Sequence, residues 1–546
     1  MKSGKAELIA IAEDVWLNAS VLQQLGGLPQ DGISHELALL STNDSDDEPK
    51  TSKSATRSDA GEGNKPQHRI FNASGLAVFM KLAIEYNDIF SNGNGRLSLL
   101  LAPLFAVLPL VSAFPAQLPA RATAPALPVD DPFYIPPEGF ESSAPGTILR
   151  HRTPPNPIAA LGFAKVNIQA AHQILYRTSD SSGNAIATVS TILIPHNADY
   201  SKLLSYQVAE DAADPNCAPS YALQLEAAHD GILGLVIPQV ELLFFGAALN
   251  KGWVVTVPDH LGPKAAFLAN NLSGQAVLDN IRAALASSSF TNITSDPTIA
   301  LWGYSGGSLA SGFAAELHPT YAPELNIVGA ALGGTVPKIR PVIEAVNKGL
   351  FVGLVPSGIQ GLANEYPDIQ QLINDGLKPS KRADFNKTQN LCLSGDILQY
   401  LGQDIYDYTN DRNIFDQPAA VKVMDANAMG QHVPKIPLLV YKSVGDEISP
   451  VNDTDALVET YCNAGASVEY KRDELSEHAS LEITGSADGL LWIMDRMNNK
   501  PVQQGCTKST AVTGLADPKA LLALGDEILT LLKAILAGPI GPGVVG

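Results

Sequence analysis

The chain has 546 residues, of which 45% are hydrophobic and 17% are charged, so it is long and apolar enough to bury a large core. Its formal net charge at pH 7 is −20. An acidic chain is poorly suited to contact the phosphate backbone of nucleic acids, so we exclude nucleic-acid binding as its function.

The first 113 residues divide into two segments of different composition. Residues 1–95 contain long polar tracts that cannot bury enough apolar surface to offset chain entropy, so we expect a disordered extension, and we hypothesise that it is a gene-model artefact. Residues 96–113 join a basic residue, Arg96, to a short apolar run that ends in Val111-Ser112-Ala113, a pattern typical of a signal peptide. A buried strand or helix is the alternative. A membrane anchor is disfavoured, because the run contains two prolines and a bilayer span needs ~20 residues.

The cysteines and glycosylation sequons also fit an exported chain. None of the four cysteines belongs to a C-x-x-C pair, which argues against a zinc knuckle or a thioredoxin motif. In an exported chain an even number of cysteines fits two disulfides, and four cysteines allow three pairings. The cysteines are Cys217, Cys392, Cys462 and Cys506, and the sequons after the signal-like segment begin at Asn271, Asn292, Asn386 and Asn452. We therefore predict a secreted, disulfide-bonded glycoprotein.

The remainder of the chain alternates between strand-like and helix-like segments. Residues 114–155 are rich in proline, and we expect an extended arm or propeptide. The turn signal at 181–184 then joins two strands of a hairpin. The expected strands are Val166–Tyr176, Ala185–Pro195, Leu203–Val208, Trp253–Val257, Thr298–Trp302, Ile327–Leu332 and Pro437–Tyr441. Apolar strands without alternation, separated by helical stretches such as Gly274–Ala286, predict an α/β fold: a mostly parallel sheet with helices on both faces.

One segment interrupts this alternation. Residues 338–431 are rich in glycine, leucine and short helical patterns, so we expect a helical cap inserted between two parts of the core, 156–337 and 432–510. Residues 511–546 are expected to form a C-terminal helix and a Gly/Pro-rich tail. The apolar stretch Leu350–Val355 in the cap fits either a lipid-facing surface or buried packing.

Gly303-Tyr304-Ser305-Gly306-Gly307 matches G-x-S-x-G, the nucleophile elbow. The expected strand that ends at Trp302 leads directly into this motif, and a helix-like run of small residues follows it. The glycines let the chain close a sharp strand-to-helix turn that exposes the serine hydroxyl. We therefore predict Ser305 as a nucleophile and the backbone N–H of Gly306 as a donor to an oxyanion.

A serine hydroxyl needs a base, and in this type of site the acid and then the histidine follow the serine along the chain. Three histidines follow Ser305: His318 lies on or just after the elbow helix, His432 precedes a strand, and His478 lies in a loop after a strand-like segment. The carboxyl ends of the strands form the catalytic edge, so His478 is our choice.

The acid is expected in the loop after the preceding strand. Asp446 follows Gly445, which permits a tight turn, and it would orient and stabilise the His478 ring. Glu447 is adjacent and equally acidic, so it is the alternative.

With these residues identified, the sequence resembles the fungal secretory lipases of the lipase A type. The resemblance extends from about Phe133 to about Thr510. The stretches that carry it, beside the elbow, are Asn216–Tyr221, Asp259–Phe267, Tyr321–Ala330 and Gly445–Ile448. It implies an α/β-hydrolase fold, hydrolysis of triacylglycerol or other carboxylic esters, and a helical cap that moves at a lipid interface.

The resemblance also implies roles for particular residues. It favours Asp446 over Glu447 as the acid and places a second oxyanion N–H at Asp211, or at Ala212 after a one-residue shift. It implies the disulfides Cys217–Cys392 and Cys462–Cys506.

The predicted mechanism is attack of Ser305 on an ester, with His478 as base and Asp446 as acid. No cofactor or metal is implied, because the pair Asp259-His260 lacks a third ligand. The expected partners are an ester or lipid substrate and, transiently, a lipid interface, with no obligate protein partner. The alternatives are a narrow-specificity esterase such as a small-molecule deacetylase, an acyltransferase, and a non-catalytic hydrolase-fold binding protein.

Overall fold

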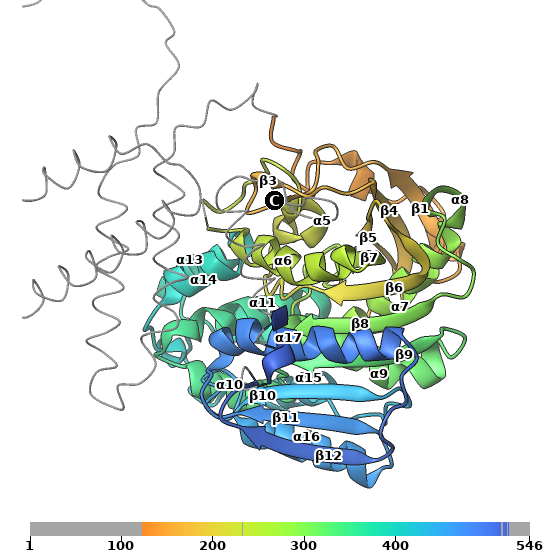
Figure 1. The fold of residues 1–546 in the computed structure, drawn as a ribbon. Coiled ribbons are helices and arrows are strands. Elements are labelled where there is room, and N and C mark those ends of the chain that lie inside the picture. Colours follow the sequence, from red (N-terminus) through yellow and green to blue (C-terminus); the bar gives the residue numbers. More distant parts are fainter. Residues whose placement is uncertain (1–122, 232, 515–516, 521, 524–546) are drawn as a thin grey trace, which may run out of the picture. The chain divides into compact units, whose positions relative to one another are not determined.

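The structure is a computed structural model that describes residues 123–231, 233–514, 517–520 and 522–523 (Figure 1). The predicted disordered extension (1–95), the signal-like segment (96–113) and most of the predicted C-terminal helix and tail lie outside the described residues. Among the described residues, no helix has the length and apolar character needed to cross a membrane.

The described residues contain a ten-stranded sheet in the order β1-β4-β5-β7-β6-β8-β9-β10-β11-β12. Neighbouring strands from β1 to β7 in this order are antiparallel, and those from β7 to β12 are parallel. The strands are β1 (Ile148–Arg152), β4 (Ala170–Ser179), β5 (Ala185–Ile194), β6 (Asp199–Gln207), β7 (Trp253–Pro258), β8 (Thr298–Tyr304), β9 (Ile327–Gly333), β10 (Leu438–Ser443), β11 (Val468–Asp473) and β12 (Cys506–Ala511). The predicted α/β fold class is therefore confirmed: all seven expected strands are present, the strand-like segment expected before His478 forms β11, and β1 and β12 are added at the edges.

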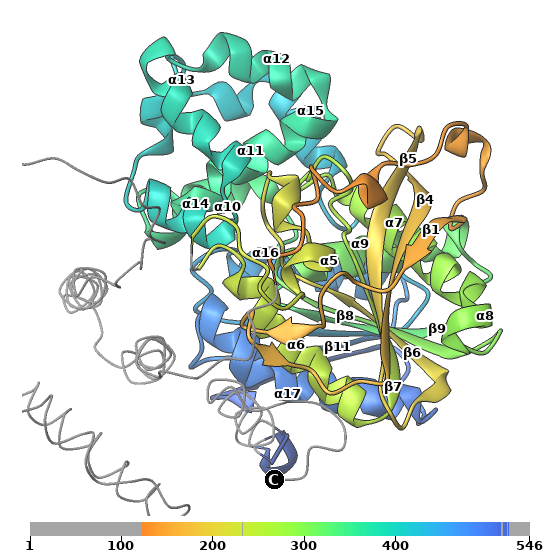
Figure 2. The same cartoon turned by 90° about the horizontal axis from the view of Figure 1, so that it is seen from above.

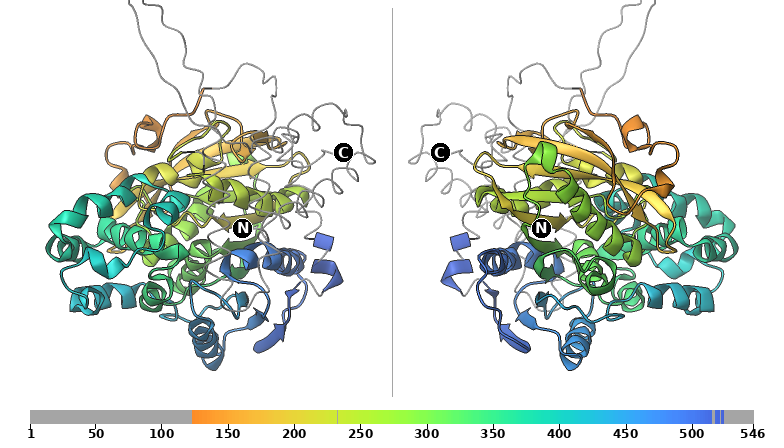
Figure 3. Two further views of the ribbon diagram at one scale, coloured as in Figure 1. Left: turned by 90° about the vertical axis from the view of Figure 1, so that its left-hand side faces the viewer. Right: turned by 90° about the vertical axis from the view of Figure 1, so that its right-hand side faces the viewer.

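Helices cover both faces of this sheet (Figures 2 and 3). Adjacent residues of one strand point to opposite faces, so Leu203 and Leu204 belong to different apolar clusters. One cluster includes α7 (Asn270–Ala286), α9 (Gly306–Tyr321) and α16 (Val451–Asn463). The other includes α6 (Val236–Asn250) and α17 (His478–Met497). Burial on both faces explains why these strands lack polar alternation.

The expectation of an unfolded, extended lead over 114–155 is wrong for its described part. Strand β1 pairs antiparallel with β4, and Phe133 is buried against β4 and β5. Arg152 forms an ion pair with Asp131 at 2.7 Å and lies over the Phe133 ring. Proline content suggested an extended arm, but one aromatic anchor and one edge strand are enough to bind this segment to the sheet.

Between β9 and β10 the chain forms a set of helices that gathers beside the sheet in Figure 2. We call residues 338–431 the cap. Its elements are α10 (Ile339–Val346), η5 (Leu350–Gly353), α11 (Leu354–Glu365), α12 (Pro367–Gly376), α13 (Pro379–Phe385), η6 (Asn386–Asn390), α14 (Leu393–Tyr400), η7 (Ile405–Tyr408), η8 (Ile414–Asp416) and α15 (Pro418–Ala426). The cap has its own apolar cluster, to which Val352 and Val355 belong. Val352 and Val355 are therefore packed within the cap, whereas Leu350, Phe351 and Leu354 of the same stretch are half-buried.

Two disulfides join distant segments, in the pairing that the resemblance implies. Cys217–Cys392 links the loop after β6 to the start of α14, and Cys462–Cys506 links α16 to the start of β12. Strand β12 is an exposed edge strand, so the second disulfide supplements a weak set of side-chain contacts.

Replacing Cys462 and Cys506 together by alanine should lower the free energy of unfolding by about 4 kcal/mol, because the closed loop spans 44 residues. Urea unfolding followed by circular dichroism measures this change. Ser509→Ala, on the same exposed strand, is the control and should change stability by less than about 0.5 kcal/mol. Equal midpoints for the double variant and the control would contradict the stabilising role of this disulfide.

Candidate active site

Ser305 occupies a sharp turn between β8 and α9, with φ of 48° and ψ of −118°. Backbone atoms leave no room for a Cβ at Gly303 or Gly307, and a Cβ at Gly306 would displace a neighbouring side chain. A Cβ at Gly303 would overlap the Gly307 carbonyl, one at Gly306 would overlap the Asp211 carboxyl, and one at Gly307 would overlap the Gln207 carbonyl. The backbone N–H of Ser305 donates to Gly333 O at 2.9 Å. The glycine pattern is thus a consequence of how closely α9 approaches the strands, and it holds Ser305 in a strained conformation.

His478 contacts the Ser305 hydroxyl, with 2.9 Å between Nε2 and Oγ. The expectation that His478 lies in a loop is wrong, because it is the first residue of α17, where Glu477 and Ser480 form a capping box that starts the helix. The His478 N–H donates to a Glu447 carboxylate oxygen at 2.7 Å, and its carbonyl accepts the Tyr304 hydroxyl at 2.6 Å. These two hydrogen bonds hold the backbone of His478 and so limit the positions that its ring can take.

Asp446 contacts the other ring nitrogen of His478, with 2.7 Å between Oδ2 and Nδ1. The same Oδ2 lies 2.7 Å from Lys442 Nζ, and Oδ1 accepts the N–H groups of Ile448 and Ser449 at 2.9 and 2.7 Å. Burial alone would raise the pKa of Asp446, but His478 and Lys442 lower it well below its ordinary value. Asp446 is therefore an anion throughout the neutral range.

The two candidate acids have different contacts. Asp446 binds the imidazole ring, whereas Glu447 binds only the His478 backbone N–H. Burial lowers the pKa of His478, but the charge and hydrogen bond of Asp446, together with Glu447, raise it, and the net pKa lies above 6.5.

Asp211 follows β6 and lies against the elbow. Its backbone has φ of 43°, and its buried carboxyl packs on Gly306. The Ser357 hydroxyl of α11 donates to Asp211 O at 3.1 Å, which connects this loop to the cap. Gly306 begins α9, where a helix leaves its first N–H groups without intrahelical acceptors. The structure therefore brings together Ser305, Gly306 and Asp211, with Ala212 buried next to Asp211.

The other histidines considered from the sequence have other contacts. His318 lies near the end of α9 with its Nε2 3.0 Å from Leu325 O, and the His432 N–H donates to Glu316 at 2.9 Å. Asp259 and His260, adjacent in the sequence, also contact different groups. Asp259 accepts two hydrogen bonds from Ser220, and His260 Nε2 lies 2.9 Å from Val208 O. These contacts are structural and do not form part of the site.

Sequence reasoning missed two residues that contact the site, Lys442 and Tyr304. Lys442 is the one charged residue in the apolar sequence of β10, and it precedes Asp446 by four positions. A lysine inside a buried strand was the signal that could have identified it, because an unpaired buried ammonium is strongly disfavoured.

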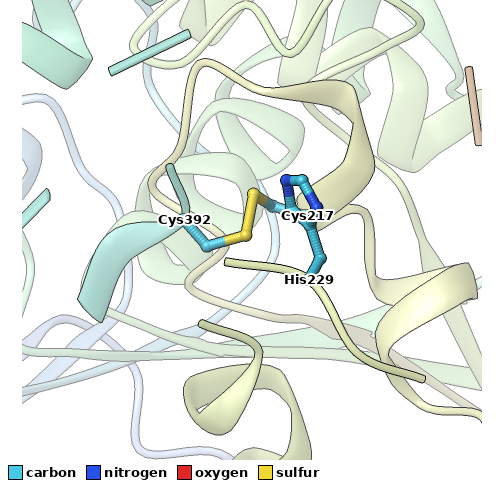
Figure 4. Close-up of side chains that lie close together, drawn as sticks. All are labelled: Cys217, His229 and Cys392. Carbon is cyan, nitrogen blue, oxygen red and sulfur yellow. A yellow bond between two sulfur atoms is a disulfide. The ribbon is translucent and has the colours of Figure 1, made fainter. Parts of the chain in front are cut away.

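One group of side chains within the described residues has the spacing of metal ligands: Cys217, His229 and Cys392 (Figure 4). The two sulfur atoms are bonded to each other, and His229 Nε2 lies 2.6 Å from an Asp214 carboxylate oxygen. Asp214 raises the pKa of His229 through this contact. The group is thus a disulfide beside a His–Asp pair.

Comparison with known proteins identifies the relatives of this chain. A family model described as secretory lipase matches residues 229–505. "Lipase A" of Arthroderma benhamiae is 49% identical over 445 residues, covering 80% of this chain and 95% of that protein. "Lipase 4" of Candida albicans is 38% identical, covering 82% and 95% respectively. The crystal structure of Candida antarctica lipase A in its closed state matches with a TM-score of 0.66 and 30% identity, covering 77% of this chain and 99% of that one.

The buried carboxyl groups predict how stability depends on pH. Burial raises the pKa of Asp259 from 3.8 to about 7, so the folded state retains a proton that the unfolded state releases. Its contribution to stability is full below pH ~4 and falls by up to ~4 kcal/mol as the pH rises through 7. Asp259→Asn should therefore make the melting temperature less dependent on pH between 5 and 8, as measured by scanning calorimetry. Parallel curves for the variant and the wild type would contradict this assignment.

Proposed function

The chain belongs to the secretory lipase family and is a carboxylic-ester hydrolase of the lipase type, and we propose that Ser305, His478 and Asp446 carry out this hydrolysis. One observation supports this proposal above all others. A chain of contacts runs from Ser305 Oγ to His478 Nε2 at 2.9 Å and from His478 Nδ1 to Asp446 Oδ2 at 2.7 Å. Nucleophile, base and acid are thus in contact without any rearrangement.

In the acylation step, His478 Nε2 accepts the Ser305 proton while Oγ attacks the ester carbonyl carbon. The carbonyl oxygen becomes an oxyanion, and we assign its donors to the backbone N–H groups of Gly306 and Asp211. Asp446 orients the ring and stabilises the imidazolium, which then protonates the departing alcohol. An acyl group remains on Ser305.

In the deacylation step, His478 accepts a proton from water, which attacks the acyl carbonyl at the same position. The same N–H groups stabilise the second oxyanion. Its collapse breaks the bond to Ser305 Oγ, which recovers its proton from His478. A carboxylic acid leaves, and the resting state returns with no cofactor used.

An apolar cavity within the cap supports an acyl chain as part of the substrate. Its volume is about 70 Å³, and apart from Tyr408 and Thr409 its lining consists of apolar side chains and Gly358. Val355 and Gly358 line it on either side of Ser357, whose hydroxyl contacts Asp211. The cavity wall therefore reaches the loop that forms one side of the site, so we propose that the cavity accommodates the end of a triacylglycerol acyl chain, since its volume is smaller than that of a whole long chain.

We further propose that the protein is exported and acts transiently at lipid interfaces. Membership in a family of secretory enzymes and the two disulfides support export. The signal-like sequence at 96–113 fits this proposal but lies outside the described residues.

Ser305→Ala should lower kcat/KM for p-nitrophenyl esters by ~10⁴-fold or more, because the nucleophile and its base act as a unit. Hydrolysis of short and long p-nitrophenyl esters, followed by emulsified triacylglycerol, measures the effect. Thr320→Ala, at the exposed end of α9, is the control and should retain activity. A folded Ser305→Ala protein with wild-type activity would disprove the proposed nucleophile.

Activity confined to short esters in the wild type would instead favour the narrow-esterase alternative over the lipase. The same assay with an added alcohol distinguishes hydrolysis from acyl transfer, because transfer yields a new ester in place of the free acid.

Ile359→Trp should narrow the cap cavity, since Ile359 lines it and is partly buried. We expect kcat/KM for a hexadecanoyl ester to fall ~10-fold or more while that for a butanoyl ester changes less than about twofold, because only the longer chain needs the cavity. Ile359→Leu, which keeps the volume, is the control. Equal losses on both esters would indicate that the cavity does not hold the acyl chain.

A further inference from the structure

The Asp446 carboxylate is shared between two side chains that carry or acquire positive charge. Oδ2 lies 2.7 Å from His478 Nδ1 and 2.7 Å from Lys442 Nζ. The side chains of Lys442 and Asp446 both have 0% exposure, so this ion pair is fully removed from water. The mechanism proposed above uses Asp446 but does not require a lysine.

Resting on that proposed function, we infer that Lys442 is a positioning residue: its ammonium group holds the Asp446 carboxylate in place and offsets its charge, so that His478 remains an unprotonated base in more acidic solution. Lys442 does not contact Ser305 or the reacting atoms in this structure. It acts through Asp446 and its electrostatic field.

The hydrogen bonds around Asp446 show how the position is held. Two backbone N–H groups bind Oδ1, from Ile448 and Ser449, and two side chains bind Oδ2. Lys442 Nζ also donates to Thr335 O at 2.9 Å, in the segment between β9 and the cap. Rotation of the carboxylate would break contacts on both oxygens, so Lys442 restricts Oδ2 to the position from which it binds the imidazole.

The electrostatic effect follows from the groups that face His478. They come from β8, β10, α17 and the loops after β6 and β10, and they are Tyr304, Lys442, Glu482, Asp211, Asp446 and Glu447. Lys442 is the only cation among these groups of the described residues. Asp446 and Glu447 raise the pKa of His478, whereas Lys442 lowers it.

The charge of Lys442 is itself maintained by neighbouring acids. Burial lowers the pKa of Lys442 below 10.5, while Asp446, Glu447 and Asp453 act in the opposite direction. With Lys442 charged, the Asp446–Lys442 pair is neutral overall, so a proton on His478 is stabilised less than it would be beside an unpaired Asp446 carboxylate. Without Lys442, the same proton would neutralise a buried carboxylate and would be bound more tightly.

A purely structural role would not favour lysine at this position. A buried ion pair loses the hydration of both charges when the protein folds, and the attraction between them often does not offset this loss. Replacing both residues by apolar side chains of similar volume is therefore often neutral or stabilising. Removing the lysine alone leaves Asp446 and its backbone donors in place. The expected consequence for the site is therefore a change in its acid–base behaviour.

Lys442→Met removes the charge with little change in volume. The acidic limb of kcat/KM for a soluble short-chain ester reports the pKa of His478 in the free enzyme. We expect this limb to move upward by about one pH unit, so that kcat/KM on its acidic side falls about tenfold, with little change in KM. The measurement covers pH 4 to 9, and a fluorophosphonate probe counts the competent sites in each preparation.

The matched control is Lys471→Met on the neighbouring strand β11. Lys471 Nζ lies 2.7 Å from an Asp488 oxygen, an ion pair of the same length that does not involve Asp446. This variant should leave the acidic limb unchanged. Lys442→Arg retains a cation and should keep the limb closer to its wild-type position than Lys442→Met does.

An acidic limb that stays in place or moves downward in folded, probe-reactive Lys442→Met overturns the inference. The same holds if Lys442→Arg and Lys442→Met shift it equally. Where Lys442→Met fails to fold, Lys442→Gln, which keeps a donor without the charge, is measured with the same criteria. Loss of the proposed function is a separate result, because it appears as activity that persists in Ser305→Ala.

Discussion

The close approach of helix α9 to the parallel strands is the constraint on which the rest of the site depends. It leaves no room for a Cβ at Gly303 or Gly307, where backbone atoms would be met, and it forces Ser305 into a conformation that residues other than glycine rarely adopt. The strain is sustained by a large buried core on both faces of the sheet. In this conformation the hydroxyl of Ser305 projects from the carboxyl end of β8.

The parallel part of the sheet then delivers the remaining groups to the same edge. Asp211 follows β6, Asp446 follows β10 and His478 follows β11, each within a few residues of the strand end. Because the carboxyl ends of parallel strands lie at one edge of the sheet, residues far apart in the chain meet there. The cap, inserted between β9 and β10, leaves from this edge and so covers the side on which these groups lie.

Much of this arrangement was predictable because local sequence determines it. The elbow motif and the apolar strands are short-range patterns, and the fold class that they predict is the one observed; the order in which the acid and the histidine follow the serine is a property of that fold. Other features depend on tertiary contacts. The proline-rich lead forms β1 because β4 offers it a free edge, His478 begins a helix because of the Glu477 cap, and the choice between Asp446 and Glu447 depends on which carboxylate reaches the ring. Lys442 was visible in the sequence, but its partner was not.

The disulfide Cys217–Cys392 has a mechanical consequence. It fixes two α-carbons 5.6 Å apart, one in the loop after Asp211 and one at the start of α14 in the cap, and Asp230 reinforces the joint by accepting the Cys392 N–H at 3.1 Å. The chain already joins the cap to the sheet at two places, before residue 338 and after residue 431, so this disulfide is a third covalent attachment. Any displacement of the cap relative to the sheet is therefore small beside Cys392 and is largest in the cap helices farthest from the three attachments.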